Sequence, residues 1–144
     1  MRILAVDYGD SRTGIAVSDE LMLIAGEAWV INERSMEAVA IAIASEAASR
    51  GVGVVVVGHP LNMNGSAGPQ AEKSESLARL LRASLPRAES GAEVVLWDER
   101  LTTVDAHRIL SVAGKRGKRR KENVDAVAAS LILEGFLERN KSSL

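Results

Sequence analysis

Three acidic residues stand where a carboxylate is costly unless it is paired, protonated or bound to a metal. Asp7 directly follows the apolar residues 3–6, Glu99 closely follows the apolar residues 94–97, and Asp125 lies between Val124 and Val127. Carboxylates that converge repel one another unless cations neutralise them. If the three meet in the folded chain, they predict a cation site. Taken alone, Asp125 has a simpler interpretation, a favourable interaction with a helix N-terminus of about 0.3–1 kcal/mol.

The remaining ligand types narrow the choice of cation. The chain has no cysteine and two histidines, His59 and His107. An all-oxygen site of this kind suits Mg²⁺ or Mn²⁺, which take carboxylates, water and phosphate oxygens. Two such ions about 4 Å apart would clamp the attacking and leaving oxygens of a phosphodiester during hydrolysis.

A dense basic segment precedes the third carboxylate. The net charge is −1, but six of the 18 basic residues lie within seven positions: Lys115, Arg116, Lys118, Arg119, Arg120 and Lys121. The rest of the chain has 12 basic and 19 acidic residues, a balance of −7. This distribution predicts a phosphate-contacting element on an acidic body. Residues 114–121 lack apolar periodicity and predict a mobile loop. Lys121 is one helical turn before Asp125 and could reach a scissile phosphate, or could simply be solvent-exposed.

The elements that must position these residues follow from hydrophobic period and capping signals. The pattern predicts strands over residues 2–7, 13–17, 21–31, 52–57 and 93–98. It predicts helices after Ser35, from Pro69, after Thr102 or Thr103, and after Asn123. This order is α/β, with a mixed five-stranded sheet made of a three-strand meander and two further parallel strands. Functional groups collect at the carboxyl ends of parallel strands, where Asp7 and Glu99 are expected.

Length and composition restrict the class of protein. A chain of 144 residues fits one domain, residues 1–144, with a hydrophobic core. No apolar run approaches the roughly 20 residues that span a bilayer, and the first residues lack a signal-sequence pattern. We therefore expect a cytoplasmic protein that does not enter membranes. The sequence carries no indication of oligomeric state.

Four motifs carry a family resemblance: DYGxxRxGxAxSD from residue 7, GxPLNMNGxxGPxA from 58, WDERLTT from 97 and KxxxDxxAAxLIL from 121. In this order they resemble the YqgF/RuvX family, which is related to the RuvC Holliday-junction resolvases. The resemblance implies a ribonuclease H-like fold and a nuclease whose metal-binding carboxylates are Asp7, Glu99 and Asp125. It also implies 5′-end processing of pre-16S ribosomal RNA, with junction resolution as an alternative. RuvC enzymes carry a fourth carboxylate where this chain has Ala128 or Ala129, and His59 replaces a commonly smaller or apolar residue.

Other motif residues suggest contacts with nucleic acid. Arg12 could contact phosphate or tie down its hairpin, and Gly9 and Gly14 would let the substrate backbone approach Asp7. The loop after residue 58 is polar and long for a connector, which suggests binding through Asn62 and Asn64. The start of the next helix favours anions, through Arg100, Thr102 and Thr103, although a threonine there could equally be a cap.

Two other classes of function compete with a nuclease. The first is a nucleotide-phosphate binder of the actin and Hsp70 type, but those proteins need two lobes to enclose ATP, more than this chain supplies. The second is a non-catalytic RNA- or protein-binding module. Loss of cleavage on chelation of Mg²⁺ separates a nuclease from a binder, and ATP binding tests the first competitor. Aromatic residues are 3% of the chain, too few for a stacking platform. Structured RNA, or branched DNA, is therefore the expected substrate.

Overall fold

A mixed five-stranded sheet forms the centre of the fold. The computed structural model describes residues 1–21, 25–85, 92–101 and 117–141, residues 117–123 by their backbone alone. The strand order is β3-β2-β1-β4-β5, with β1 antiparallel to β2, β2 antiparallel to β3, and β1, β4 and β5 parallel. The strands are β1 (Arg2–Asp7), β2 (Thr13–Ser18), β3 (Ala25–Ile31), β4 (Val52–His59) and β5 (Glu93–Asp98). The meander with two added parallel strands is confirmed.

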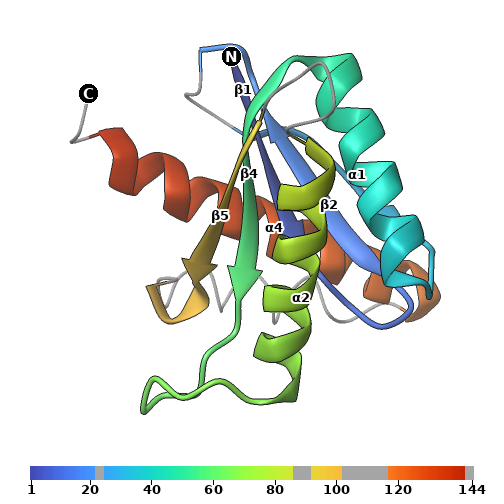
Figure 1. Cartoon of the computed structure of the whole chain (residues 1–144), viewed down its shortest axis with the longest axis vertical. Coiled ribbons are helices and arrows are strands. Elements are labelled where there is room, and N and C mark those ends of the chain that lie inside the picture. Colours follow the sequence, from blue (N-terminus) through green and yellow to red (C-terminus); the bar gives the residue numbers. More distant parts are fainter. Residues whose placement is uncertain (22–24, 86–91, 102–116, 142–144) are drawn as a thin grey trace.

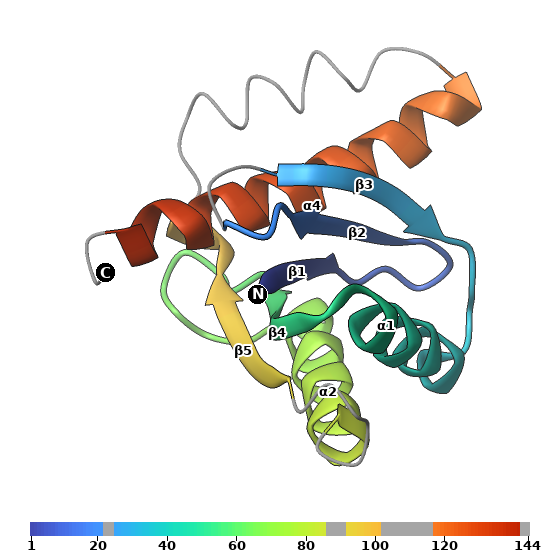
Figure 2. The ribbon, with the colours of Figure 1, turned by 90° about the horizontal axis from the view of Figure 1, so that it is seen from above.

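Helices cover both faces of the sheet (Figure 2). The helices α1 (Met36–Arg50) and α2 (Pro69–Ser84) pack on one face, and α4 (Gly117–Lys141) crosses the other. Alternate residues of β1 divide between two cores: Leu4 and Val6 pack with α1 and α2, and Ile3 and Ala5 pack with α4. A strand buried on both faces is apolar at every interior position, which is the pattern of residues 3–6. By the same alternation, Asp7 belongs to the α4 face.

Local signals in the sequence set several element ends. The Ser35 hydroxyl accepts the Ala38 N–H at 3.2 Å and caps α1. Gly51 ends α1 in the left-handed conformation, with φ of 65°. Pro69 is the first residue of α2, where its missing N–H costs nothing. These three expectations are confirmed because each depends only on neighbouring residues.

The carboxyl ends of the parallel strands β1, β4 and β5 lie at one edge of the sheet (Figure 1). The chain after β4 extends beyond this edge before it turns into α2. The short 3-10 helix η2 (Glu99–Leu101) directly follows β5. Asp7 and Glu99 therefore lie at the same edge of the sheet.

The starts of two elements differ from the sequence prediction. The helix α4 begins at Gly117 rather than after Asn123, so the prediction of a loop is wrong for residues 117–121. Lysine and arginine are good helix formers, and the packed turns from Val124 onward allow helix to propagate towards the N-terminus. Asp125 consequently lies more than two turns inside α4, too far from the helix N-terminus for a dipole interaction. β3 begins at Ala25, and Leu21 is a turn residue.

The predicted helix after Thr102 or Thr103 lies outside the described residues. In the residues that are described, none of the helices combines the length and the apolarity that crossing a bilayer requires.

Candidate active site at the carboxyl edge of the sheet

Asp7 is the central residue of the candidate site. It is the last residue of β1, directly opposite Gly14 of β2, and it is half-buried. The pKa of Asp7 is raised to about 7, mainly by burial and in addition by the negative charges of Glu99 and Asp125. A carboxylate in this position holds a proton near neutral pH unless a cation replaces that proton.

Glu99 enters the site from η2, at the end of β5. Its carboxylate packs over Gly58 of β4: a β-carbon at Gly58 would lie 3.2 Å from Glu99 Cδ and 3.3 Å from Oε2. Burial raises the pKa of Glu99, the nearby His59 lowers it, and the charge of Asp98 raises it. Gly58 thus makes room for the second carboxylate, a role that local sequence patterns do not reveal.

Asp125 enters from the opposite direction, on α4. This helix passes so close to β2 that a β-carbon on Gly14 would overlap the carbonyl oxygen of Asp125. Gly14 therefore admits the backbone of α4, not the substrate backbone that the sequence analysis expected there. Likewise, a β-carbon on Gly9 would overlap the carbonyl oxygen of Arg12, so Gly9 serves the hairpin turn.

The side chain of Asp125 is already paired. Arg12 Nε lies 3.4 Å from Asp125 Oδ2, and roughly three tenths of each side chain is exposed. Burial raises the pKa of Asp125, while the charge and hydrogen bonding of Arg12 lower it. Of the two roles considered for Arg12, the structure shows a tie, and that tie joins the β1–β2 hairpin to α4.

The three carboxylates lie near one another but do not form a closed ligand set. Both Glu99 and Asp125 act electrostatically on Asp7, which places them around it. Within the described ranges, no three acidic or histidine side chains are spaced as a metal site requires. A proton on Asp7 and the guanidinium of Arg12 offset part of the repulsion here. The arrangement is that of an acidic cluster at the carboxyl edge of the sheet.

Arg100 and the loop after β4 brace each other. Arg100 donates to both carboxylate oxygens of Asp98, at 2.7–3.1 Å, and its Nη1 donates to the Met63 carbonyl at 3.4 Å. Asn62 Nδ2 donates to Ser66 Oγ at 3.0 Å, and Asn64 Oδ1 accepts from both the N–H and the hydroxyl of Ser66. The amide groups of Asn62 and Asn64 that were expected to bind substrate thus hold the loop itself together.

Two contacts from α2 brace the hairpin that carries Asp7. Gln70 Nε2 donates to the Tyr8 carbonyl at 3.0 Å, and Lys73 Nζ lies 2.8 Å from Asp10 Oδ1. On the same side, His59 Nε2 lies 2.8 Å from Glu75 Oε2. These pairs were not predicted from the sequence, because they join residues that are distant in the chain and no local pattern marks them.

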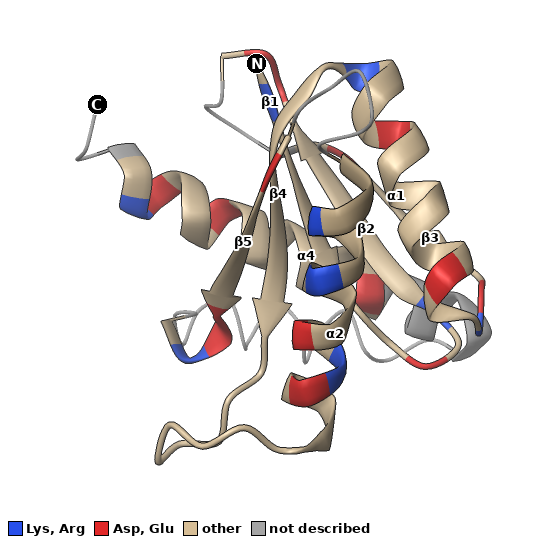
Figure 3. Ribbon diagram, viewed as in Figure 1, with Lys and Arg blue, Asp and Glu red and all other residues tan. Residues whose placement is uncertain are grey.

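The basic segment is only partly described. Lys118, Arg119, Arg120 and Lys121 belong to the first turns of α4 by their backbone. Thr102, Thr103, Lys115 and Arg116 lie outside the described residues. In Figure 3, acidic and basic residues are mixed along α2.

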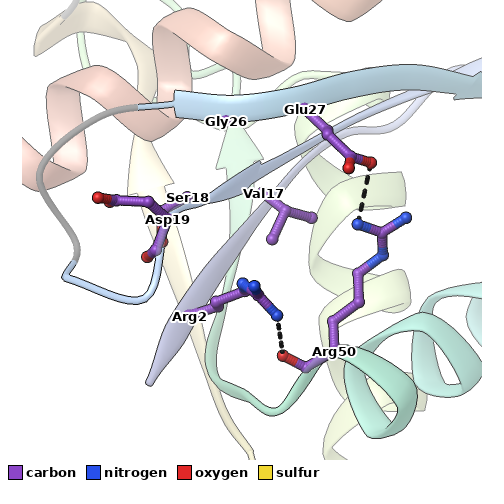
Figure 4. Close-up of a pocket in the computed structure, with 7 residues that line it drawn as sticks. All are labelled: Arg2, Val17, Ser18, Asp19, Gly26, Glu27 and Arg50. Carbon is purple, nitrogen blue, oxygen red and sulfur yellow. Dashed lines mark hydrogen bonds and ion pairs between the residues drawn. The ribbon is translucent and has the colours of Figure 1, made fainter.

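A small hollow of about 160 Å³ lies at the opposite end of the sheet, between the start of β1 and the end of α1 (Figure 4). The two arginine side chains that line this hollow already have partners. Arg2 Nη1 donates to the Arg50 carbonyl at 3.1 Å, and Arg50 Nη1 lies 3.0 Å from Glu27 Oε2. The Arg50 guanidinium also stacks 4.5 Å from the centre of the Trp29 ring. These contacts stabilise the end of α1 and do not form part of the candidate site.

The fold is that of the ribonuclease H-like nucleases. RuvC of Thermus thermophilus, solved in complex with Holliday junction substrate, superposes with a TM-score of 0.61 at 13% identity and covers 96% of each chain. The fowlpox virus Holliday junction resolvase superposes with a TM-score of 0.55 at 13% identity over all of both chains. At these identities the likeness concerns the fold.

The sequence itself defines the family. The family model RuvX, described as Holliday junction resolvase, matches residues 1–139. This chain belongs to the RuvX family. A relative from Myxococcus xanthus is 43% identical over 98% of this chain and 90% of its own, and one from Halalkalibacterium halodurans is 42% identical over 98% and 99%. A third, from Ruminiclostridium cellulolyticum, is 37% identical over 99% and 100%. All three carry the name "Putative pre-16S rRNA nuclease".

The raised pKa of Asp7 predicts how stability depends on pH in the metal-free protein. The folded pKa of about 7 lies above the ordinary value of 3.8, so the folded state binds the proton more tightly than the unfolded state. Stability is then greatest below about pH 4 as far as Asp7 is concerned, and it is lost as the pH rises through 7. Glu99 and Asp125 act in the same direction, since their pKa values are also raised.

We expect the free energy of unfolding in chelator to fall between pH 5 and pH 8, on the order of a few kcal/mol. Urea titrations at both pH values measure it. In Asp7→Asn the side chain cannot ionise, so much of this fall should disappear. Equal pH dependence of the parent and Asp7→Asn would contradict the assignment to Asp7.

Proposed function

We propose that the chain is a metal-dependent nuclease that processes the 5′ end of pre-16S ribosomal RNA, with Asp7, Glu99 and Asp125 as its metal-binding carboxylates. The observation that carries the proposal is the placement of Glu99 and Asp125 beside the half-buried Asp7 at the carboxyl edge of the sheet. The backbone of Asp125 meets Gly14, the strand partner of Asp7, and the Glu99 carboxylate packs over Gly58, next to Asp7 on the neighbouring strand. The family and the names of its relatives support the same activity. This function would place the protein in the bacterial cytoplasm, where ribosomes are assembled.

The donor set suits Mg²⁺ or Mn²⁺. All three side chains offer hard oxygen ligands, and burial raises the pKa of each, which disfavours the bare carboxylate without a cation. When bound, the metal would lower the pKa of the attacking water and offset charge on the phosphate. Arg12 would have to release Asp125 for metal binding, which frees its guanidinium at the site edge.

Other residues of the chain would hold the polyanion. A freed Arg12 offers a planar, bidentate donor that matches phosphate oxygens. The basic residues Lys115, Arg116, Lys118, Arg119 and Arg120 would contact flanking phosphates, and their charge makes binding depend strongly on salt. Lys121 precedes Asp125 by one helical turn in α4, which suits contact with the scissile phosphate. Thr102 and Thr103 would add hydroxyl donors beside Glu99. Arg100, paired with Asp98, is assigned to positioning the loop instead.

A second candidate substrate is branched DNA. The family description, Holliday junction resolvase, favours it. Both substrates require the same hydrolysis of a phosphodiester, so the carboxylates have the same roles in either case. The difference must be made by groups outside the carboxylate cluster.

A direct cleavage assay tests both. We expect the protein to cleave a structured RNA that carries the 5′ precursor segment of 16S rRNA in the presence of Mg²⁺ or Mn²⁺, and to lose this activity in chelator. A four-way DNA junction is assayed in parallel at equal concentration. A preparation of Asp7→Asn made in the same way reveals contaminating nucleases. Cleavage that survives chelation, or no cleavage of either substrate with either metal, would contradict the proposal.

A further inference from the structure

The loop after β4 is a rigid projection beside the candidate site. It extends beyond the carboxyl edge of the sheet (Figure 1). Backbone hydrogen bonds close it: Asn62 N donates to the Ser66 carbonyl at 2.9 Å, and Gly65 N donates to the Asn62 carbonyl at 2.8 Å. Gly65 has φ of 88°, which permits the turn. Together with the side-chain bonds of Asn62 and Asn64, these contacts fix the tip.

The tip presents an apolar side chain to solvent. Met63 is 89% exposed, at the centre of this closed turn. Asn62 Nδ2 and Asn64 Oδ1 are engaged within the loop, so Met63 is the large apolar side chain that the tip offers to a partner. Leu101 of η2, 42% exposed, adds a second apolar side chain at the same edge.

Arg100 fixes the distance between this tip and the chemistry. Its Nη1 donates to the Met63 carbonyl, while its other nitrogens hold Asp98. Arg100 directly follows Glu99, one of the three carboxylates. A nucleic acid bound at Glu99 and extending past Arg100 would therefore meet the loop that carries Met63.

The chemistry of a duplex indicates what Met63 can recognise there. A phosphate backbone offers no apolar surface to a methionine side chain. A base that is unstacked at a bulge, branch or helix end exposes its apolar face, which such a side chain can contact. Methionine is among the apolar side chains that insert between base steps as wedges. The aromatic rings that could stack on such a base are engaged elsewhere: Tyr8 and Trp97 are buried, Phe136 packs edge-on against Trp97, and Trp29 lies under Arg50.

We propose that Met63 is a wedge that contacts an unstacked nucleobase next to the cleaved bond and so directs the enzyme to bulges, branches and helix ends. This inference rests on the proposed nuclease function and adds a determinant of specificity to it. A single exposed apolar residue is by itself ordinary. The rigid, projecting and Arg100-anchored position distinguishes Met63 from Leu21 and Ile41, which are 73% and 71% exposed.

The test uses binding, so that it does not depend on cleavage. Asp7→Asn serves as background, with Mg²⁺ and two RNA duplexes of equal length, one fully paired and one with a single bulged 2-aminopurine. We expect the background protein to prefer the bulged duplex and to increase 2-aminopurine fluorescence as the base unstacks. Adding Met63→Ala should reduce that preference about fivefold and abolish most of the fluorescence change. Met63→Leu should retain both, and Met63→Gln, of similar length but polar, should lose both.

Leu21→Ala is the matched control, since it removes an equally exposed apolar side chain from the turn after β2, at the other end of the sheet. It should change neither readout. Equal binding of both duplexes by the background protein, or equal losses on both duplexes with Met63→Ala, would overturn the proposal. Failure of the nuclease function is seen separately, as absence of metal-dependent cleavage by the parent.

Discussion

Asp7→Asn is expected to lower the rate of phosphodiester cleavage by several orders of magnitude while the fold persists. Asparagine has the size of aspartate but no charge, so it cannot supply the anionic ligand that a divalent metal needs between Glu99 and Asp125. The fold should persist because asparagine fits the same space and removes a carboxylate whose charged form is disfavoured by burial and by the charges of Glu99 and Asp125. Single-turnover cleavage at saturating protein measures the chemical step.

Binding provides the contrasting readout. The affinity of Asp7→Asn for RNA should equal or slightly exceed that of the parent, because one negative charge near the phosphates is removed. Asp10→Asn is the matched control: it makes the same chemical change three residues later, on an exposed carboxylate paired with Lys73. That variant should cleave like the parent. If Asp7→Asn also cleaves like the parent, Asp7 is not a metal ligand and the proposed mechanism fails.

Gly14→Ala should have the second large effect, on stability and on cleavage together. The new β-carbon would overlap the carbonyl oxygen of Asp125, and a backbone atom of a packed helix cannot move as a side chain can. The helix α4 must shift away from β2, which we expect to cost about 1–3 kcal/mol of unfolding free energy. The same shift displaces Asp125 from Asp7, so cleavage should fall more than the loss of folded protein explains.

Gly53→Ala is the control for this experiment. It places the same methyl group in a strand, but the new β-carbon would meet only the side chain of Met1, which is exposed and free to rotate. Urea midpoints and single-turnover rates of both variants make the comparison. A Gly14→Ala protein with the midpoint of the parent would show that α4 does not approach β2 as closely as described.

The sequence by itself determined the class of fold, and it predicted which acidic residues belong to the candidate site. The apolar run before Asp7 indicated a strand covered on both faces, and helices on both faces of the sheet confirm it. Ser35, Gly51 and Pro69 marked helix ends because capping depends on the residues next to it. Such signals are local, and a single sequence displays them directly.

The tertiary structure decided how these residues are used. Asn62 and Asn64 are predicted to bind nucleic acid, and only the structure shows that one atom of each amide also closes a loop that displays Met63. Gly14 looked like a gap for substrate, yet it seats the backbone of α4, which begins well before the capping signal suggested. Both depend on contacts between segments far apart in the chain, which hydrophobic period and local propensity do not encode. The ion pair of Arg12 with Asp125 has the same origin, since only the packing of α4 across β2 brings the two together.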